Sequence, residues 1–461
     1  MIVQRLRLGV LTAVTAALLG GCMMGPDYER PDVAAPASYD IPVTSGESIA
    51  NVEWFKLLKD PNLDRLIRVA LEENKNLLTA VARVDEARAR LGFVRADQFP
   101  QISGQASGAK ANSVLIPGLR TENYVLSAGL SWEVDLWGKL RRSTESARAQ
   151  LLSTVEARNQ VLVTLIADVS SAYFLLLDLD DRVSIAERTL KTRQDATGII
   201  QARYDEGIVP LLDVNQAQIE EADAAAQLAA LIREREQTEN LLSVLLGRNP
   251  GTVIRTGGLN KREAPEQIPA GLPSELLERR PDIRQAEQAL AAQTALIGVA
   301  QAQRFPSLSL TGTFGLVSNE LSNFVDSDNT AGAFGVDLVG PIFDAGKRRS
   351  QVEAERARTV QLQRQYEQAI IEAFAEVEDA LIALETLQDE LAARTAQVVA
   401  AQSASNLSRA RYNGGVTSYL EVLESDRSRF RAELSESSIR RERLVALVNL
   451  YKALGGGWTP E

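Results

Sequence analysis

The stretch Asp135-Leu136-Trp137-Gly138-Lys139 separates two different patterns of residues along the chain. Apolar and polar residues alternate before it, and a very long run that is almost free of Gly and Pro follows it. The chain repeats this stretch as Phe343-Asp344-Ala345-Gly346-Lys347, in which the glycine stands 208 residues after the first. Gly207 and Gly415 have the same separation. We therefore interpret the chain as one structural unit that is written twice.

The alternating segments predict β-strands, because successive side chains of a strand point to opposite faces. Apolar residues take every second position through most of 124–136 and through two segments of the second half. Residues 101–116 are less regular, but they are small and polar rather than helical. We expect four strands, arranged as one β hairpin over 101–137 and another over 307–342.

Four runs contain neither Gly nor Pro: 139–197, 211–246, 347–413 and 416–454. As a helix, the third run would be about 100 Å long, which exceeds the core of a compact domain. The first and third runs lead toward Arg-Tyr-x-x-Gly, and the next run starts within a few residues of that glycine. We expect two long helices, each folded back as a helical hairpin with a tight turn at the glycine, over 139–248 and 347–454.

A shorter helical pattern precedes each pair of strands, from about Asn62 to Arg95 and from about Pro273 to Ala302. Each pattern is followed closely by a Phe-Pro pair. The predicted organisation is a first repeat over 61–255, a linker over 256–272, a second repeat over 273–455 and a tail over 456–461.

The N-terminus has the pattern of a bacterial lipoprotein signal. Two arginines precede an apolar run over 8–19 that is too short to span a bilayer, and Cys22 follows two glycines. We expect a signal peptide over 1–21, acylation of Cys22 after cleavage, and an extended leader over 22–60. Met23 stands where an inner-membrane retention signal typically carries Asp, so by analogy the lipoprotein goes to the outer membrane. The alternative is an ordinary secretory signal with a chance cysteine.

Composition disfavours several classes of function. The formal net charge is −11, which argues against nucleic acid as a partner. The chain has no histidine and one cysteine, so the commonest general base and the usual ligands of zinc and iron–sulfur clusters are missing. No nucleophile or phosphate-binding motif stands out. We expect no enzyme activity, no cofactor and no metal site.

Four strands are too few for a closed barrel, since small closed barrels need about eight. In lipid, an open sheet would leave two edges of unpaired backbone groups, which is energetically costly. The edges are expected to pair with copies of the same chain, so that three copies complete a twelve-stranded barrel. Polar residues would then line its lumen: Ser127, Ser131, Glu133 and Asp135. The alternative is a soluble sandwich with one polar face.

Cations cluster where both long helices begin, over 139–142 and 347–349, and there they oppose the helix dipole. Anionic lipid headgroups at the inner rim of the barrel are expected to offset this cost, with Trp132, Trp137 and Phe343 as an interfacial belt. The alternative is a pair of plain, solvated helix starts.

Four motifs stand in order along the chain: Met24-Gly25-Pro26-Asp27-Tyr28, Glu133-Val134-Asp135-Leu136-Trp137-Gly138, Pro273-Ser274-Glu275-Leu276-Leu277-Glu278-Arg279-Arg280-Pro281-Asp282-Ile283 and Tyr451-Lys452-Ala453-Leu454-Gly455-Gly456-Gly457-Trp458. Together they resemble the lipoprotein branch of the TolC-like outer membrane efflux factors, and the resemblance covers nearly the whole mature chain. It implies an α+β membrane protein that forms a homotrimer. A twelve-stranded outer membrane β-barrel, four strands per protomer, would continue into a long periplasmic α-helical barrel with a small equatorial domain.

The resemblance also implies partners and a gate. Such trimers are the exit ducts of tripartite pumps, joined through a periplasmic adaptor to an inner-membrane transporter, often of the RND class. The segment that matches the family's acidic rings places a periplasmic aperture at Leu420, Glu421 and Glu424. The alternative for Glu421 is a capping-box partner of Ser418 in the first turn of a helix.

Further positions match a latch and a docking surface in the family. Tyr412 matches the tyrosine that holds the closed state, and Asp213 matches the carboxylate that it contacts. The alternatives are a core aromatic for Tyr412 and a first-turn acid for Asp213. Thr417 departs from relatives that carry a basic residue there, which puts a second, charged latch in doubt. The exposed tips that match the adaptor-docking surface are Gly207, Ile208, Val209, Gly415, Val416 and Thr417; the alternative for the glycines is a role in the turns alone.

These patterns favour a passive outer membrane duct for drugs and other toxic small molecules. The exit channel of a type I protein-secretion system is an alternative, because such tunnels look alike. A lipid-anchored periplasmic coiled-coil adaptor is disfavoured, because it needs neither lipid-facing strands nor duplicated helices.

Overall fold

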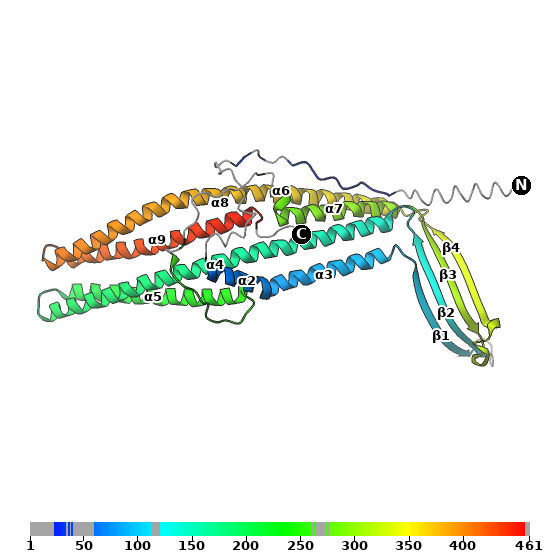
Figure 1. Ribbon diagram of the computed structural model, residues 1–461, viewed down its shortest axis with the longest axis horizontal. Helices are drawn as coiled ribbons and strands as arrows, with labels where there is room; N and C mark the ends of the chain where they lie inside the picture. Colours follow the sequence, from blue (N-terminus) through cyan, green and yellow to red (C-terminus); the bar gives the residue numbers. More distant parts are fainter. Residues whose placement is uncertain are drawn as a thin grey trace. The chain divides into compact units, whose positions relative to one another are not determined.

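The computed structural model describes residues 23–33, 36, 38–39, 60–112, 120–259, 262, 273 and 276–456 (Figure 1). The predicted signal peptide, Cys22 and most of the predicted linker lie outside these residues. The chain divides into two compact units. Unit 1 takes its described residues from 1–33, 82–156 and 283–369, and unit 2 takes them from 34–81, 157–282 and 370–461.

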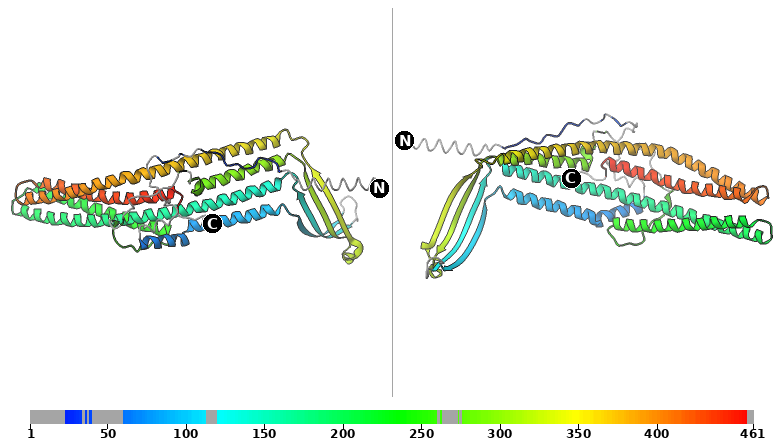
Figure 2. Two further views of the ribbon diagram at one scale, coloured as in Figure 1. Left: turned by 45° about the horizontal axis from the view of Figure 1, so that its top comes forward. Right: turned by 180° about the vertical axis from the view of Figure 1, so that it is seen from behind.

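Unit 1 contains one antiparallel sheet of four strands in the order β1-β2-β3-β4. The strands are β1 (Gln101–Asn112), β2 (Arg120–Val134), β3 (Ser307–Ser318) and β4 (Thr330–Val339). Two short 3₁₀ turns, η5 (Leu321–Asn323) and η6 (Ser327–Asn329), connect β3 to β4. Strands β2 and β3 come from different repeats, so their pairing joins the two halves of the chain. Figure 2 shows the four strands as one curved layer from two further sides.

The register separates apolar from polar side chains. One row of cross-strand neighbours consists of Trp132, Leu310 and Val336. The adjacent row consists of Glu133, Ser309 and Asp337. Because neighbouring rows lie on opposite faces, one face of the sheet is apolar and the other is polar, as the alternation predicts.

The apolar face is uncovered within the chain. The side chains of Ile102 and Phe334 are 78% and 71% exposed, respectively. Among the described strands, β1 and β4 each have one neighbour only, so the sheet has two open edges. An exposed apolar face of this size marks a membrane or protein interface rather than a soluble surface.

Each repeat contributes one very long helix and one partner of about half its length. Helices α4 (Lys139–Asp205) and α8 (Lys347–Asn413) both have 67 residues. Helices α5 (Leu211–Leu245) and α9 (Tyr419–Ala453) both have 35 residues. The two repeats therefore keep the same helix lengths at the same offset, and α4 continues through Gly198, where the sequence pattern stops at residue 197.

The shorter helices are α2 (Pro61–Glu73), α3 (Lys75–Ala96), α6 (Leu276–Arg279) and α7 (Pro281–Ala302). The helical pattern predicted before each pair of strands is present, and each consists of two helices. Asn74 ends α2 with ψ near 124°, and its side-chain oxygen accepts a hydrogen bond from Leu77 N at 2.9 Å in the first turn of α3. Pro281 disfavours helical geometry at the residue before it, so α6 ends at Arg279.

The main core of unit 2 is built around the middle of α4. Tyr173, Phe174 and Leu177 are fully buried there, against Leu447 and Leu450 of α9. This part of α4 is long and apolar enough to meet a composition test for a membrane span, but most of it is buried inside the chain. Its apolar character is therefore explained by core packing.

Candidate channel-lining site and hairpin tips

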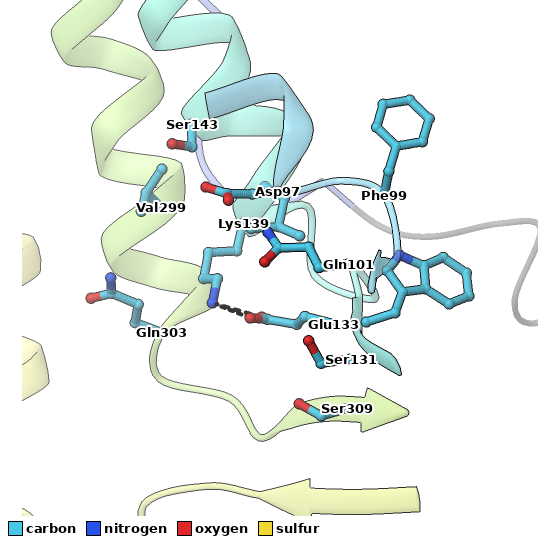
Figure 3. Close-up of a pocket in the computed structure, with 12 residues that line it drawn as sticks. Asp97, Phe99, Gln101, Ser131, Glu133, Lys139, Ser143, Val299, Gln303 and Ser309 are labelled. Carbon is cyan, nitrogen blue, oxygen red and sulfur yellow. Dashed lines mark hydrogen bonds and ion pairs between the residues drawn. The ribbon is translucent and has the colours of Figure 1, made fainter. Parts of the chain in front are cut away.

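The polar face of the sheet ends in a pocket of about 500 Å³ within unit 1 (Figure 3). Strands β1, β2 and β3 and the nearby helix ends supply its polar side chains, which are Asp97, Gln101, Ser131, Glu133, Lys139, Ser143, Gln303 and Ser309. Lys139 at the start of α4 forms an ion pair with Glu133 of β2, with 2.6 Å between Nζ and Oε1. This surface can hold water and hydrated polar solutes.

Carboxylates of the same chain lie close to most of the cations at the starts of the long helices. The Asp135 carboxylate accepts hydrogen bonds from the backbone N–H groups of Leu140 and Arg141, at 3.1 and 2.9 Å. It also lies 3.3 Å from Nε of Arg141. Asp344, one position later in the repeat, lies before α8 and accepts from Arg348 N at 3.3 Å. These intrachain carboxylates offset part of the cost against the helix dipole, and a contact with anionic lipid headgroups stays a prediction.

The two hairpin tips in unit 2 have the same backbone design. Gly207 has φ of 72°, and Gly415 has φ of 71°. Gly207 N donates to Tyr204 O at 2.8 Å, and the next N–H, that of Ile208, donates to Arg203 O at 2.8 Å. This pair of bonds is the Schellman arrangement, and the second tip repeats it. Both glycines are needed for their positive φ, because open space surrounds each of them.

Side chains at the tips differ in exposure. Ile208 and Val416 are 70% and 71% exposed, so they are available to a partner. Val209 is half-buried and packs against a small apolar cluster shared by both hairpins, and its part in docking stays a prediction. The buried members of this tip cluster are Ile200, Val214, Ala217, Tyr419, Val422 and Leu423.

Tyr412 also packs against the tip cluster. Its ring lies 5.4 Å from that of Tyr419, and the Arg203 guanidinium lies 5.1 Å from its centroid. Its hydroxyl is buried, with no hydrogen-bond partner among the described residues. Asp213 is half-buried in the first turn of α5, and no hydrogen bond joins it to Tyr412 in the described part of a single chain. The latch between them stays a prediction.

The predicted aperture residues lie at the start of α9. Leu420 and Glu424 are exposed, and Glu424 lies 3.8 Å from Arg427. Glu421 pairs with Arg411 at 3.2 Å and accepts a hydrogen bond from the Thr417 hydroxyl. The alternative role of Glu421 as a capping-box partner is wrong, because the side chain of Ser418 makes no cap hydrogen bond.

A cluster of ion pairs joins the two helical hairpins near the predicted aperture residues. The sequence analysis did not predict it. Glu220 of α5 is 7% exposed and accepts from Arg427 Nε of α9 at 2.7 Å. Arg193 of α4, equally buried, lies 3.2 Å from the same carboxylate. The repeat offset from Glu220 leads to Ser428, so the cluster is not duplicated and no motif signals it.

A buried carboxylate forms a second tie between α4 and α9. Asp178 is 1% exposed, and Ser437 donates to its Oδ1 at 2.5 Å. Arg441 and Arg182 approach its other oxygen at 3.5 and 3.7 Å. Burial raises the pKa of Asp178 above its usual range, and the hydrogen bond from Ser437 and the two arginines oppose this shift.

The structure gives a physical reason for the third sequence motif. Arg280 is 5% exposed and pairs with Asp282 at 2.6 Å and with Glu376 of α8 at 2.7 Å. It also donates to Ala453 O at the end of α9 at 2.8 Å. Arg280 therefore fixes the carboxyl end of α9 against α8 in the core of unit 2.

An open sheet with one apolar and one polar face, in a chain that also forms long helical hairpins, is typical of the protomer of a membrane channel. A family model described as "Outer membrane efflux protein" matches residues 66–248 and, a second time, residues 272–456. The chain belongs to this family. The two matches coincide with the two repeats, so each repeat is a copy of the family's structural unit.

Individual relatives agree with this assignment. The outer membrane protein OprJ of Pseudomonas aeruginosa is 35% identical over 98% of this chain and 96% of its own length. The cation efflux system protein CusC of Escherichia coli K12 is 32% identical over 97% of this chain and 99% of its own length.

Solved structures show the same fold. The outer-membrane channel OprN superposes with a TM-score of 0.87 at 32% identity, covering 95% of this chain and 100% of that one. The open state of the MtrE channel of Neisseria gonorrhoeae gives a TM-score of 0.85 at 34% identity, covering 95% and 98%.

These comparisons confirm the predicted resemblance, the fold class and the main function. The chain is an outer membrane efflux channel protein, and its family is one of ducts rather than enzymes. Lipid attachment, the aperture, the latch and the docking tips are left untested by them, and they remain predictions.

Proposed function

We propose that three copies of the chain form the exit duct of a tripartite efflux pump in the outer membrane. The observation that carries this proposal is the open four-stranded sheet, whose apolar face and two edges are uncovered within one chain. Three such sheets would supply the twelve strands of a barrel wide enough for water. The polar row with Glu133 and Asp337 would then line its lumen.

A periplasmic adaptor and an inner-membrane transporter, of the RND class, would complete the pump. The exposed tip residues Ile208 and Val416 are the apolar anchors that we assign to the adaptor. The transporter supplies the energy, and this chain conducts passively. Small toxic molecules are the proposed cargo, because related proteins are named as a toluene efflux pump component and an antibiotic efflux pump component.

Closure of the duct is assigned to the start of α9. Three-fold symmetry would turn Leu420, Glu421 and Glu424 into rings, with the exposed Glu424 carboxylates as the ring with the strongest mutual repulsion. Tyr412 and Asp213 would act as the latch between neighbouring copies. Cys22 would carry the lipid that anchors the leader in the outer membrane.

Crosslinking of the sheet edges tests the assembly. Gln105→Cys in the middle of β1 is combined with single cysteines scanned over 331–337 of β4. Oxidation is expected to give a ladder of linked chains that ends at three, because the ring closes there. Ser127→Cys of β2, an interior strand, serves as the matched control in place of the β1 cysteine. A ladder that ends at two, or no product for any pair, would refute the shared barrel.

A further inference from the structure

The leader segment 23–33 is docked in unit 1, along α4 and α7. Met24 N donates to Trp137 O at 3.1 Å, beside the junction of β2 and α4. Arg30 makes two hydrogen bonds to Glu287 of α7, at 2.9 and 2.7 Å. The leader therefore contacts one helix from each repeat through specific polar groups.

A buried arginine holds the centre of this segment. Arg142 of α4 is 2% exposed and donates to the carbonyl oxygens of Met24 and Gly25, at 3.0 and 3.2 Å. It also pairs with Asp27 at 2.7 Å and with Glu145 of its own helix at 2.8 Å. Both backbone carbonyls that accept hydrogen bonds from this buried guanidinium belong to the leader. Removing the leader would therefore leave Arg142 with fewer hydrogen-bond partners.

Two glycines allow the leader to approach the helices this closely. A Cβ atom added to Gly25, which has φ of 93°, would lie 2.4 Å from the Cα atom of Gly298 in α7. A Cβ atom added to Gly298 would lie 2.4 Å from Met24 O and 2.8 Å from Cγ of Arg142. Any larger residue at Gly298 would displace the leader or the arginine.

Among the described residues, these features occur in one of the two repeats. Gly92, the counterpart of Gly298 in the first repeat, has open space around its Cβ position. Ser350 stands at the repeat offset from Arg142. Because the fold is otherwise duplicated, the buried arginine and the close glycine contact are present only where the leader lies.

We propose that the groove between α4 and α7 is a dedicated binding site for the leader, with Arg142 as its positioning residue. The docked leader clamps the first repeat to the second at the base of the sheet. A lipid at Cys22, one residue before Met23, would then act from a fixed point rather than from a loose tether. This clamp goes beyond the proposed duct function, and it consists of peptide contacts that need no lipid.

Cysteine labelling of the full-length protein measures docking. Met24→Cys places a half-buried thiol in the leader, and the parent chain serves as the blank for Cys22. Adding Gly298→Ala is expected to raise the rate of maleimide labelling at least about tenfold, because the added methyl group excludes the leader. The matched control Gly92→Ala, also a helix glycine, is expected to leave the rate unchanged.

Two further variants make the result decisive. Glu287→Gln weakens the clamp without adding bulk, and we expect a smaller rise in the rate of maleimide labelling. This variant tests the clamp even when the Gly298→Ala chain does not fold. Cys22→Ser removes the lipid site, and docking is expected to persist. Equal labelling in the Gly298→Ala and Gly92→Ala chains would overturn the clamp. So would release of the leader in Cys22→Ser, because the lipid would then be what holds the segment.

Discussion

Removal of the Arg427 guanidinium is expected to loosen the tie between the two helical hairpins. Arg427 contributes one of the two cationic partners of Glu220, and the second, Arg193, stays in place at 3.2 Å. Breaking a fully buried ion pair costs about 3–5 kcal/mol. Since Arg427 is 37% exposed and Glu220 keeps one partner, we expect the loss in Arg427→Met to be about 1–2 kcal/mol.

We expect the two hairpins to separate when the duct opens, so this loss of free energy should raise the open fraction of the channel. A difference of about 1.4 kcal/mol is tenfold in an equilibrium constant, so the ratio of separated to tied hairpins should rise roughly 5- to 30-fold. Single-channel recording in planar bilayers measures the open fraction of the purified protein. Arg431→Met, on the exposed part of α9 one turn away, is the control and should behave as the parent.

A double-mutant cycle separates this tie from a general loss of stability. Glu220→Gln and Arg427→Met are made singly and together, and their coupling is expected to be about 1 kcal/mol or more. Additive effects of the two changes would refute the reasoning, as would an open fraction for Arg427→Met that matches that of Arg431→Met.

Three other changes test features of unit 2. Gly207→Ala should lower the free energy of unfolding by about 1–2 kcal/mol, because φ there is 72°, whereas Gly198→Ala inside α4 should be neutral or stabilising; thermal unfolding followed by circular dichroism compares them. Arg280→Met should cost about 1–3 kcal/mol in denaturant unfolding, because the buried Ala453 carbonyl loses its donor. Burial raises the pKa of Asp178, so the folded chain holds this proton more tightly than the unfolded chain does. The stability of the parent relative to Asp178→Asn should therefore increase as the pH falls from the raised pKa toward the ordinary value near 4, and unfolding midpoints at several pH values would show a flat or opposite trend if this is wrong.

Local patterns in the sequence were sufficient for the architecture. The alternation over 124–136 fixes which face of β2 is apolar, and the glycine spacing fixes the hairpin turns at Gly207 and Gly415. Both signals arise from backbone geometry within a few residues, so they can be recognised in a single sequence without related sequences. The break at Asn74 escaped detection because a capping side chain looks like any other polar residue inside a helical pattern.

Contacts between remote residues account for most of what the sequence did not reveal. Glu220 and Arg427 are 207 residues apart, and neither belongs to a repeated motif. The role of Val209 depends on a cluster that forms only when both hairpins are folded. The pairing of Arg141 with Asp135 could have been predicted from the sequence, because a carboxylate shortly before the start of a helix is a common cap.

The hydrogen bonds between β2 and β3 join the two repeats. These bonds do not depend on the covalent connection between the repeats. Two half-length polypeptides from separate genes should therefore assemble into the same tube, six around its axis. The leader belongs to one half and reaches Gly298 and Glu287 in the other. In such a split protein, this short N-terminal segment would be the element by which the first half recognises the second.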